Sequence, residues 1–412
     1  MQKLVVGISV LVFLSLISNA SAQVHKAAHP RSPVAAEQSF FKNLGAVPAH
    51  MAASNNMSGE ANAATMQQPQ RIVSVPTFVS SFRFHGKTFP YTMMGQAPQT
   101  RATTVIPTSY VPVSFVFDEF IDQNGNNITI DATAINNEIL RSPEFLPSAF
   151  STGNTQFTDA VQRAEFFHII NKDGDNDADD SWHTLLGQPR ILTPVLVEVP
   201  VGSSEVFVLP DGTFFALIDI NFLNSQLFTL LQTENVNIHE LPILLTRNTV
   251  YGDFQAGQPL DCCIGGYHGA IETNQVQNNI FVQIFSFATS LDSNVADGIF
   301  GDPGIFADVN ALSHEIAETT DDPFGNNITP NYQIPGAPPG VCQNVLEIGD
   351  VIENLTPEYT SITLHGFTYH PQTMGLLQWF EGLSPSNAID KAYSYPDTTL
   401  LTSPFTPCPA SN

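Results

Sequence analysis

The residues that point most directly to chemistry lie in one segment, DVNALSHEIAETTDDP, at positions 308–323. His314 and Glu318 are four residues apart, so on a helix they share one face. Glu315 follows His314 and lies at the edge of that face. Imidazole nitrogen and carboxylate oxygen are both zinc ligands. The spacing therefore predicts that His314 and Glu318 hold a metal ion, with Glu315 beside it.

This geometry requires that the segment be a helix, and its apolar residues recur at helical spacing: Val309, Leu312 and Ile316. At about 100° per residue, His314 lies roughly 200° around the helix from Leu312, away from the apolar face. Asp308 is a suitable N-cap, and the helix must end before Pro323. An ordinary surface helix with charged side chains is the structural alternative.

The pattern His-Glu-Ile-Ala-Glu is the zinc-peptidase motif HExxH with Glu in place of the second His. In that motif the two outer residues bind zinc, and the inner Glu is the general base for a metal-activated water. We therefore expect Glu315 to be the base. The extra carboxylate of Glu318 makes the metal a weaker Lewis acid and favours harder ions.

A third ligand is expected from the acidic segment that follows the helix, where Glu347 and Asp350 occur in LEIGD. Either carboxylate could return to the site. Upstream, two glycines precede Tyr267 and His268 and allow close approach of the backbone. Tyr267 or His268 could then polarise a carbonyl group or donate a proton. A purely structural histidine is the alternative for His268.

The chain has four cysteines: Cys262, Cys263, Cys342 and Cys408. A disulfide between neighbouring cysteines strains the peptide. We therefore expect one of Cys262 and Cys263 to bond Cys342, which would fix the acidic segment, and the other to bond Cys408.

An alternating acidic stretch holds Asp173, Asp175, Asp177 and Asp179. Calcium loops often show this alternation, but an EF-hand also needs Gly at its sixth position and Glu at its twelfth. Counted from Asp173, Ala178 and Thr184 stand there, so the stretch is either a weak calcium site or a solvated insertion.

Farther along the chain, the sequence gives less reason to assign a functional role to His370 than to His314 or His268. We expect Trp379 and Phe380 to pack on a short helix.

Short β-branched runs with Gly and Pro between them predict strands at 73–84, 111–117, 191–209, 213–220, 242–250 and 280–288. Helical patterns occupy 155–169 and 221–231. Strands and helices mix without a regular βαβ rhythm, so the predicted class is α+β. The N-terminal half is β-rich, and the C-terminal half carries the zincin-like metal-site helix.

The N-terminus predicts export. Lys3, the apolar run at 4–17 and Ala20-Ser21-Ala22 match a signal peptide over residues 1–22. A disordered leader is expected at 23–70, a β-rich α+β region at 71–235 and the metal-site region at 236–412. The expected location is secreted, extracellular or periplasmic, with no stable membrane span.

The net charge of the chain limits the kinds of molecule that it can bind. Lys and Arg number 14 against 39 Asp and Glu, for a net charge of −25. Nucleic-acid binding depends on cationic side chains, so a nucleic-acid partner is excluded.

The strings SHEIAETTDDPF, CCIGGYHGA and LEIGD and the late Trp379-Phe380 pair resemble a group of secreted bacterial proteins of unassigned function, over most of the chain after about residue 75. More remotely, the C-terminal half is similar to the plant EXORDIUM, or phosphate-induced, secreted proteins. That family has a Cys-x-x-His segment and a similar helix end but can lack the His-Glu pair. These resemblances imply secretion and no particular activity.

Together these observations predict a secreted, zincin-like metalloprotein that hydrolyses peptide bonds with a metal-activated water. Zinc is the expected cofactor, and a peptide or protein is the expected substrate. Two alternatives stay open: a non-catalytic extracellular or cell-surface protein with a structural metal, and a carbohydrate- or wall-binding module.

Overall fold

The computed structural model describes residues 71–409 except 123, 172–180, 233–235, 261 and 277–278. The predicted signal peptide and leader at 1–70 lie outside the described residues. The four aspartates of the calcium hypothesis lie outside them too: Asp173, Asp175, Asp177 and Asp179.

In the described part of the chain, eight strands form one mixed sheet. They are β1 (Arg71–Val73), β5 (Thr108–Ile121), β6 (Asn127–Ile130), β10 (Arg190–Ile191), β11 (Val195–Val199), β14 (Leu241–Arg247), β18 (Gly266–Val276) and β19 (Asn279–Ser290). Strand β14 pairs in parallel with β5 and β19, and β18 pairs antiparallel with β19. The boundary that we placed near residue 235 therefore runs between strands of one sheet.

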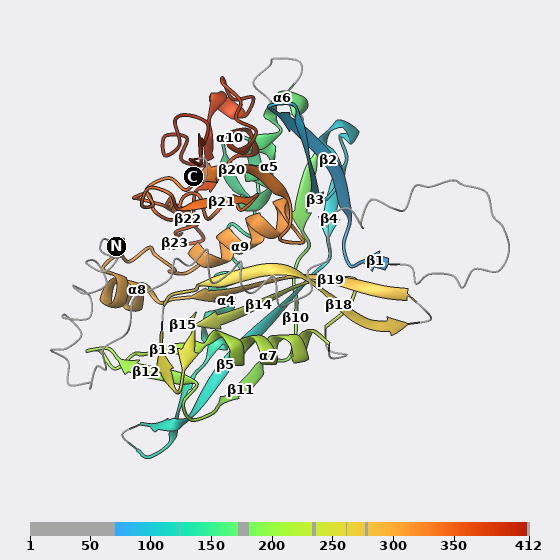
Figure 1. The fold of residues 1–412 in the computed structure, drawn as a ribbon. Coiled ribbons are helices and arrows are strands. Elements are labelled where there is room, and N and C mark those ends of the chain that lie inside the picture. The colour runs from blue at the N-terminus through green and yellow to red at the C-terminus, as the bar shows by residue number, and fades with distance from the viewer. Residues whose placement is uncertain are drawn as a thin grey trace.

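The sheet is covered on both faces, because successive side chains of a strand point to opposite sides. On one face lies α7 (Ile220–Leu231), and on the other lies α9 (Asn310–Asp321), as Figure 1 shows. The α7 face packs Leu244, Phe285 and Phe287 against Leu223 and Leu227. The α9 face packs Ile243, Leu245 and Ile284 against Leu312 and Ile316.

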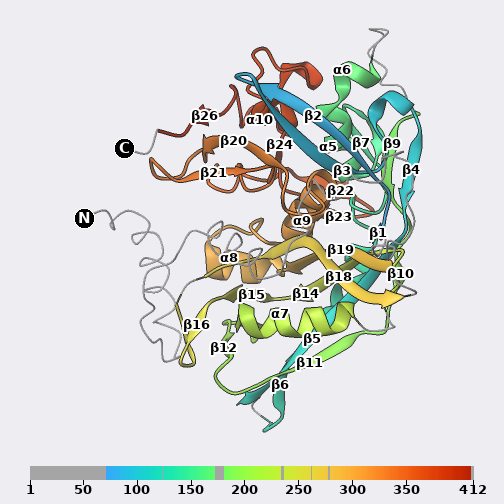
Figure 2. The same cartoon turned by 45° about the vertical axis from the view of Figure 1, so that its right-hand side comes forward.

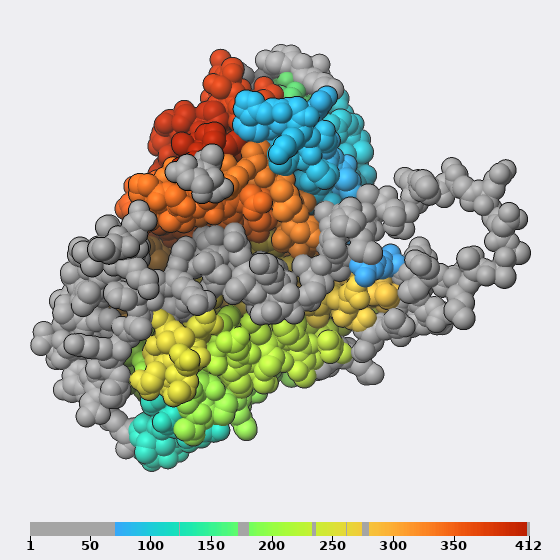
Figure 3. Space-filling view, viewed as in Figure 1, coloured from blue at the N-terminus to red at the C-terminus, as the bar shows by residue number. Residues whose placement is uncertain are grey.

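A second layer covers the far side of α9 (Figure 2). It contains β2 (Thr77–Phe84), β3 (Lys87–Met94), α5 (Phe157–Glu165), α6 (Phe167–Ile170), β20 (Ile328–Gln333), β21 (Cys342–Val345), α10 (Leu377–Phe380) and β26 (Thr406–Pro407). In the space-filling view, the blue strands β2 and β3 adjoin the orange-to-red C-terminal residues (Figure 3). Ala317 of α9 belongs to the core of this layer. Every residue of α9 is consequently buried, including its polar face.

Shorter elements complete the described fold. The strands are β4 (Thr103–Ile106), β7 (Ser148–Phe150), β8 (Gly153–Thr155), β9 (His183–Leu186), β12 (Ser204–Val208), β13 (Phe214–Asp219), β15 (Thr249–Gly252), β16 (Phe254–Gln255), β17 (Gln258–Pro259), β22 (Ile362–Leu364), β23 (Phe367–Tyr369), β24 (Met374–Gly375) and β25 (Ser394–Tyr395). The helices are α4 (Asn136–Ile139) and α8 (Ser293–Phe300), with short 3-10 turns at Pro98–Thr100, Ala132–Ile135 and Ile389–Lys391.

The predicted helices at 155–169 and 221–231 are confirmed as α5 with α6 and as α7. The expected packing role of Trp379 and Phe380 is confirmed, because both rings lie edge-on against Tyr332. The class is strand-rich α+β, as expected.

The N-cap prediction for α9 is wrong, because Val309 takes that position without a side-chain hydrogen bond. Asp308 instead binds His370: its Oδ1 accepts from the backbone N–H of His370 at 2.9 Å, and its Oδ2 lies 2.7 Å from Nδ1. This carboxylate holds the loop before α9 onto the segment that follows β23. The contact favours a structural role for His370.

The predicted disulfide pairing is also wrong. Cys342 bonds Cys408, and Cys262 bonds Cys263. The reason is that β20 pairs with both β21 and β26, which brings the Cα atoms of Cys342 and Cys408 to 6.1 Å. Two cysteine pairs at bonding distance are consistent with an oxidising compartment.

Candidate metal centre

Two segments that are distant in sequence approach the polar face of α9. They are strand β18 and the loop that carries Glu347 and Asp350. The backbone fixes the loop on the helix. Gly349 N–H and Asp350 N–H both donate to Glu318 Oε1, at 2.8 and 3.2 Å. The second oxygen, Oε2, is left facing the two histidines.

The first group of candidate ligands is His314, Glu318 and Asp350, all buried. His314 Nε2 lies 3.0 Å from Glu318 Oε2 and 3.6 Å from Asp350 Oδ1. Three such atoms can converge on one ion at the usual zinc–ligand distances of about 2.0–2.2 Å.

The outer atoms of these side chains are held by hydrogen bonds to two glutamines. Gln343 Nε2 donates to Asp350 Oδ2 at 3.0 Å. Gln372 Nε2 donates to the carbonyl of Gly349 at 2.8 Å, so its Oε1 is the acceptor for His314 Nδ1–H at 3.0 Å. This bond places the proton on Nδ1 and leaves Nε2 for a metal. Such outer partners orient metal ligands.

Sequence reasoning did not find Gln343 or Gln372. Only their sequence neighbours could have pointed to them, since Gln343 follows Cys342 and Gln372 follows the His370 segment. An amide carries no charge and forms no recognised motif at this spacing.

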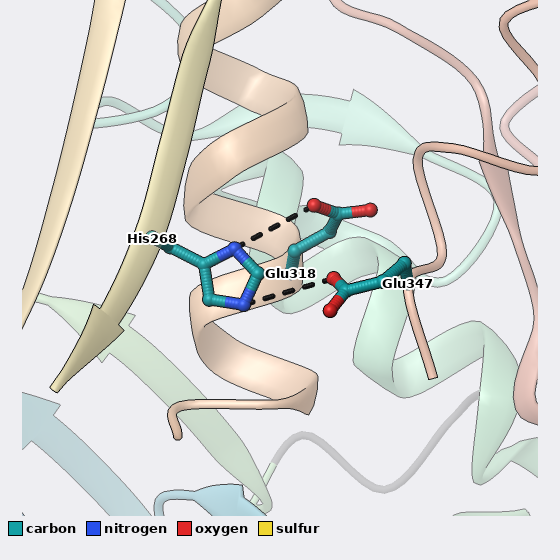
Figure 4. Close-up of side chains that lie close together, drawn as sticks. All are labelled: His268, Glu318 and Glu347. Carbon is teal, nitrogen blue, oxygen red and sulfur yellow. Dashed lines mark ion pairs between the residues drawn. The ribbon is translucent and has the colours of Figure 1, made fainter. Parts of the chain in front are cut away.

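The second group is His268, Glu318 and Glu347, also buried (Figure 4). His268 projects from β18 toward α9, with Nδ1 3.6 Å from Glu318 Oε2 and Nε2 3.7 Å from Glu347 Oε2. Glu315 Oε2 lies 3.5 Å from the same Nδ1. The two groups share Glu318.

Two glycines permit this packing. A Cβ on Gly266 would come within 2.6 Å of Glu315 Cγ and of the carbonyl oxygen of Phe287. A Cβ on Gly349 would come within 2.6 Å of His314 Nδ1. The close approach that we expected before Tyr267 and His268 is therefore confirmed at Gly266.

Tyr267 does not join the cluster. It alternates with His268 along β18, so its ring packs with Phe285 and Phe287 on the α7 face. Its hydroxyl donates to Asn224 Oδ1 at 2.7 Å. The expectation that Tyr267 acts on a substrate carbonyl therefore receives no support, and we leave this residue out of the site.

Burial and neighbouring charges shift the pKa values of the groups in the cluster. Burial raises the pKa of Asp350 to about 7 and raises the pKa of Glu315. Burial alone would also raise the pKa of Glu318, but the charge of His314 brings that pKa below its ordinary value. Burial alone would lower the pKa of His314, but Glu318 raises it well above 6.5.

A cation fits this set of atoms. Glu315 Oε2 and Glu318 Oε2 are buried and accept no well-directed hydrogen bond from the described residues, although each lies near an imidazole. Buried carboxylate oxygens without donors are costly, and a metal ion satisfies them. Nitrogen and oxygen ligands of this kind suit Zn²⁺, Mn²⁺ or Fe²⁺.

Comparisons with protein-family models, with curated proteins and with solved structures found no match for this chain. In the described part of the chain, no helix has the length and apolar character to cross a membrane. Fold and site together define a strand-rich α+β protein with buried His, Glu and Asp groups that could bind a metal.

Proposed function

We propose that this chain is an exported, metal-dependent hydrolase that cleaves peptide bonds. One observation carries the proposal: His314, Glu318 and Asp350 converge from α9 and the following loop, and each has its outer atom already held. Such a prearranged group is what a catalytic metal site needs.

In this proposal His314 Nε2, Glu318 Oε2 and Asp350 Oδ1 hold the ion, which supplies Lewis acidity and activates water. Glu315 follows His314 on α9, and burial raises its pKa, which is the direction expected for a general base. The likeness to the zinc-peptidase helix supports a peptide substrate. The Cys342–Cys408 pair and the signal-peptide pattern support export.

Glu315→Gln tests the division of roles. It keeps the size of the side chain but removes the base. We expect it to retain the metal and to lose about 10²–10⁴-fold in the rate of peptide cleavage. His314→Ala should lose the metal and the activity together. Elemental analysis and a fluorogenic-peptide assay on metal-replete mature protein measure both properties.

Glu144→Gln is the matched control. Glu144 is a buried carboxyl outside the cluster, bound by the hydroxyl of Thr158 at 3.0 Å. It should keep both metal and activity. If Glu315→Gln cleaves peptides as fast as the wild type, the assignment of Glu315 as the base is wrong. A wild type that takes up no metal would refute the proposal as a whole.

The alternative is a structural metal site. The observation that favours it is burial: His314, Glu315 and Asp350 are each less than 8% exposed. Closed metal sites stabilise folds, whereas catalytic ones keep a position open for water. A tightly held ion with no cleavage of any peptide, together with a fall in melting temperature on chelation, would favour this alternative.

A further inference from the structure

The shared carboxylate of Glu318 links the two groups of candidate ligands. One of its oxygens, Oε2, faces an imidazole nitrogen on each side: His314 Nε2 at 3.0 Å and His268 Nδ1 at 3.6 Å. Asp350 Oδ1 lies 3.6 Å from the same nitrogen of His314, and Glu347 Oε2 lies 3.7 Å from the other nitrogen of His268, Nε2. The arrangement is two half-sites that meet at one oxygen atom, and Figure 4 shows the half-site of His268, Glu318 and Glu347.

The ring of His268 is oriented as a metal ligand would be. Its Nε2–H donates to the backbone carbonyl of Asp322 at 3.0 Å, because a carbonyl oxygen can only accept. In the neutral ring this leaves the lone pair on Nδ1, which faces Glu318 Oε2. His314 shows the same pattern with its nitrogens exchanged, since its Nδ1–H is bound by Gln372. A backbone carbonyl behind the imidazole is a common outer partner of metal-binding histidine.

Four carboxyl groups gather in this buried space. Glu315, Glu318, Glu347 and Asp350 are each under 5% exposed. Carboxylate oxygen is a ligand for divalent cations, so the cluster has enough donor atoms for two ions when both groups share Glu318.

We propose that the cluster holds two divalent cations bridged by Glu318 Oε2. The first lies between His314, Glu318 and Asp350, and the second between His268, Glu318 and Glu347. This inference shares Glu318 with the proposed hydrolase site but does not require that site to be catalytic. Each half-site offers one imidazole and two carboxylates, a set that suits Mn²⁺, Fe²⁺ or Zn²⁺. Bridged ions of this type lie about 3.5–4 Å apart.

In the two-ion arrangement His268 is a ligand, and proton donation by this residue is no longer needed. Glu315 Oε2, at 3.5 Å from His268 Nδ1, then lies beside the second ion. Glu315 would thus be placed to accept a proton on the His268 side of the site. The second ion adds a Lewis acid on the β18 side of the site.

Metal stoichiometry tests the inference on the full mature chain. Apo-protein is titrated with Zn²⁺ in a calorimeter, and bound metal is measured after dialysis. We expect two ions for the wild type, one for Glu347→Gln and one for Asp350→Asn. The control Glu144→Gln should bind two.

The failures of the two proposals are distinguishable. One ion in the wild type, lost in Asp350→Asn but kept in Glu347→Gln, would overturn the two-ion inference and leave the hydrolase site intact. One ion that follows Glu347 instead would overturn both sets of assignments. No bound ion would refute both proposals.

A measurement on the wild type alone covers the case in which a variant does not fold. Mn²⁺ is added in steps and followed by electron paramagnetic resonance. We expect the signal of an isolated ion after one equivalent and an exchange-coupled pair after two. Two additive signals of isolated ions would show that Glu318 does not bridge them.

Discussion

Replacing Gly349 with Ala tests whether the packing of the acidic loop on His314 positions the candidate metal ligands. The new Cβ would stand 2.6 Å from His314 Nδ1 and 2.7 Å from Cε1 and Cγ. Relaxed contacts between such atoms are about 3.5 Å, so the ring or the loop must move by roughly 0.9 Å. The backbone of Gly349 is not in the left-handed region, so the effect is purely steric.

Neither movement leaves the site intact. If the ring of His314 moves away, its hydrogen bond to Gln372 Oε1 is lost. If the loop moves away, the 2.8 Å hydrogen bond from Gly349 N–H to Glu318 Oε1 is lost. Loss of an outer partner of a ligand typically weakens metal binding by about 10–100-fold. We therefore expect the Zn²⁺ affinity of Gly349→Ala to fall by that factor.

The assay is a Zn²⁺ titration of apo-protein with a competing chelator, and circular dichroism checks the fold. Gly298→Ala in α8 is the control, because its Cβ would meet only the flexible end of Leu209, at 3.1 Å. It should bind Zn²⁺ as the wild type does. A folded Gly349→Ala whose affinity stays within twofold of the wild type would refute the packing argument.

Three further predictions concern protons and covalent structure. Because Glu318 raises the pKa of His314, binding a metal must expel a proton, so Zn²⁺ affinity should rise about tenfold per pH unit below that pKa; a flat profile from pH 6 to 8 would contradict this. Burial raises the pKa of Glu144 to about 8, so the folded chain keeps a proton that the unfolded chain releases from about pH 4.5 upward. Unfolding free energy should therefore fall by up to about 1.4 kcal/mol per pH unit between these values, and denaturant titrations of Glu144→Gln should lose that slope. Removing the Cys342–Cys408 bond by Ser substitution should cost about 2–5 kcal/mol of stability, read from the same titrations; an unchanged midpoint would show that the bond does not constrain the chain.

The helix that carries His314, Glu315 and Glu318 was predictable, but its surroundings were not. The spacing of His314 and Glu318 and the stop at Pro323 define α9 from local sequence alone. Its burial on every side depends on a second layer built from β2, β3, α5 and the C-terminal segment, and no local pattern reveals that layer. The same limit explains the cysteines, since the pairing of Cys342 with Cys408 follows from β26 joining β20.

Within the site, the charged and ring-bearing residues were visible in the sequence and the amides were not. Glu347 and Asp350 were expected as alternatives for one position, whereas the structure brings each to a different histidine. Gln343 and Gln372 orient their neighbours through single hydrogen bonds, which depend on the fold and not on spacing. Tyr267 and His268 were expected side by side, whereas strand alternation sends them to opposite faces of the sheet.

The distance in sequence between β18, α9 and the acidic loop has a consequence for when a metal ion could be acquired. An unfolded chain does not hold these candidate ligands together, so the site exists only once the sheet and its second layer have formed. Affinities of first-row metals follow a fixed order, and supply then decides which ion is taken. A chain that folds after export would draw on the metals outside the cytosol. Protein folded inside an expression host would carry that host's cytosolic ion, so metal identity is best determined on material folded in its own compartment.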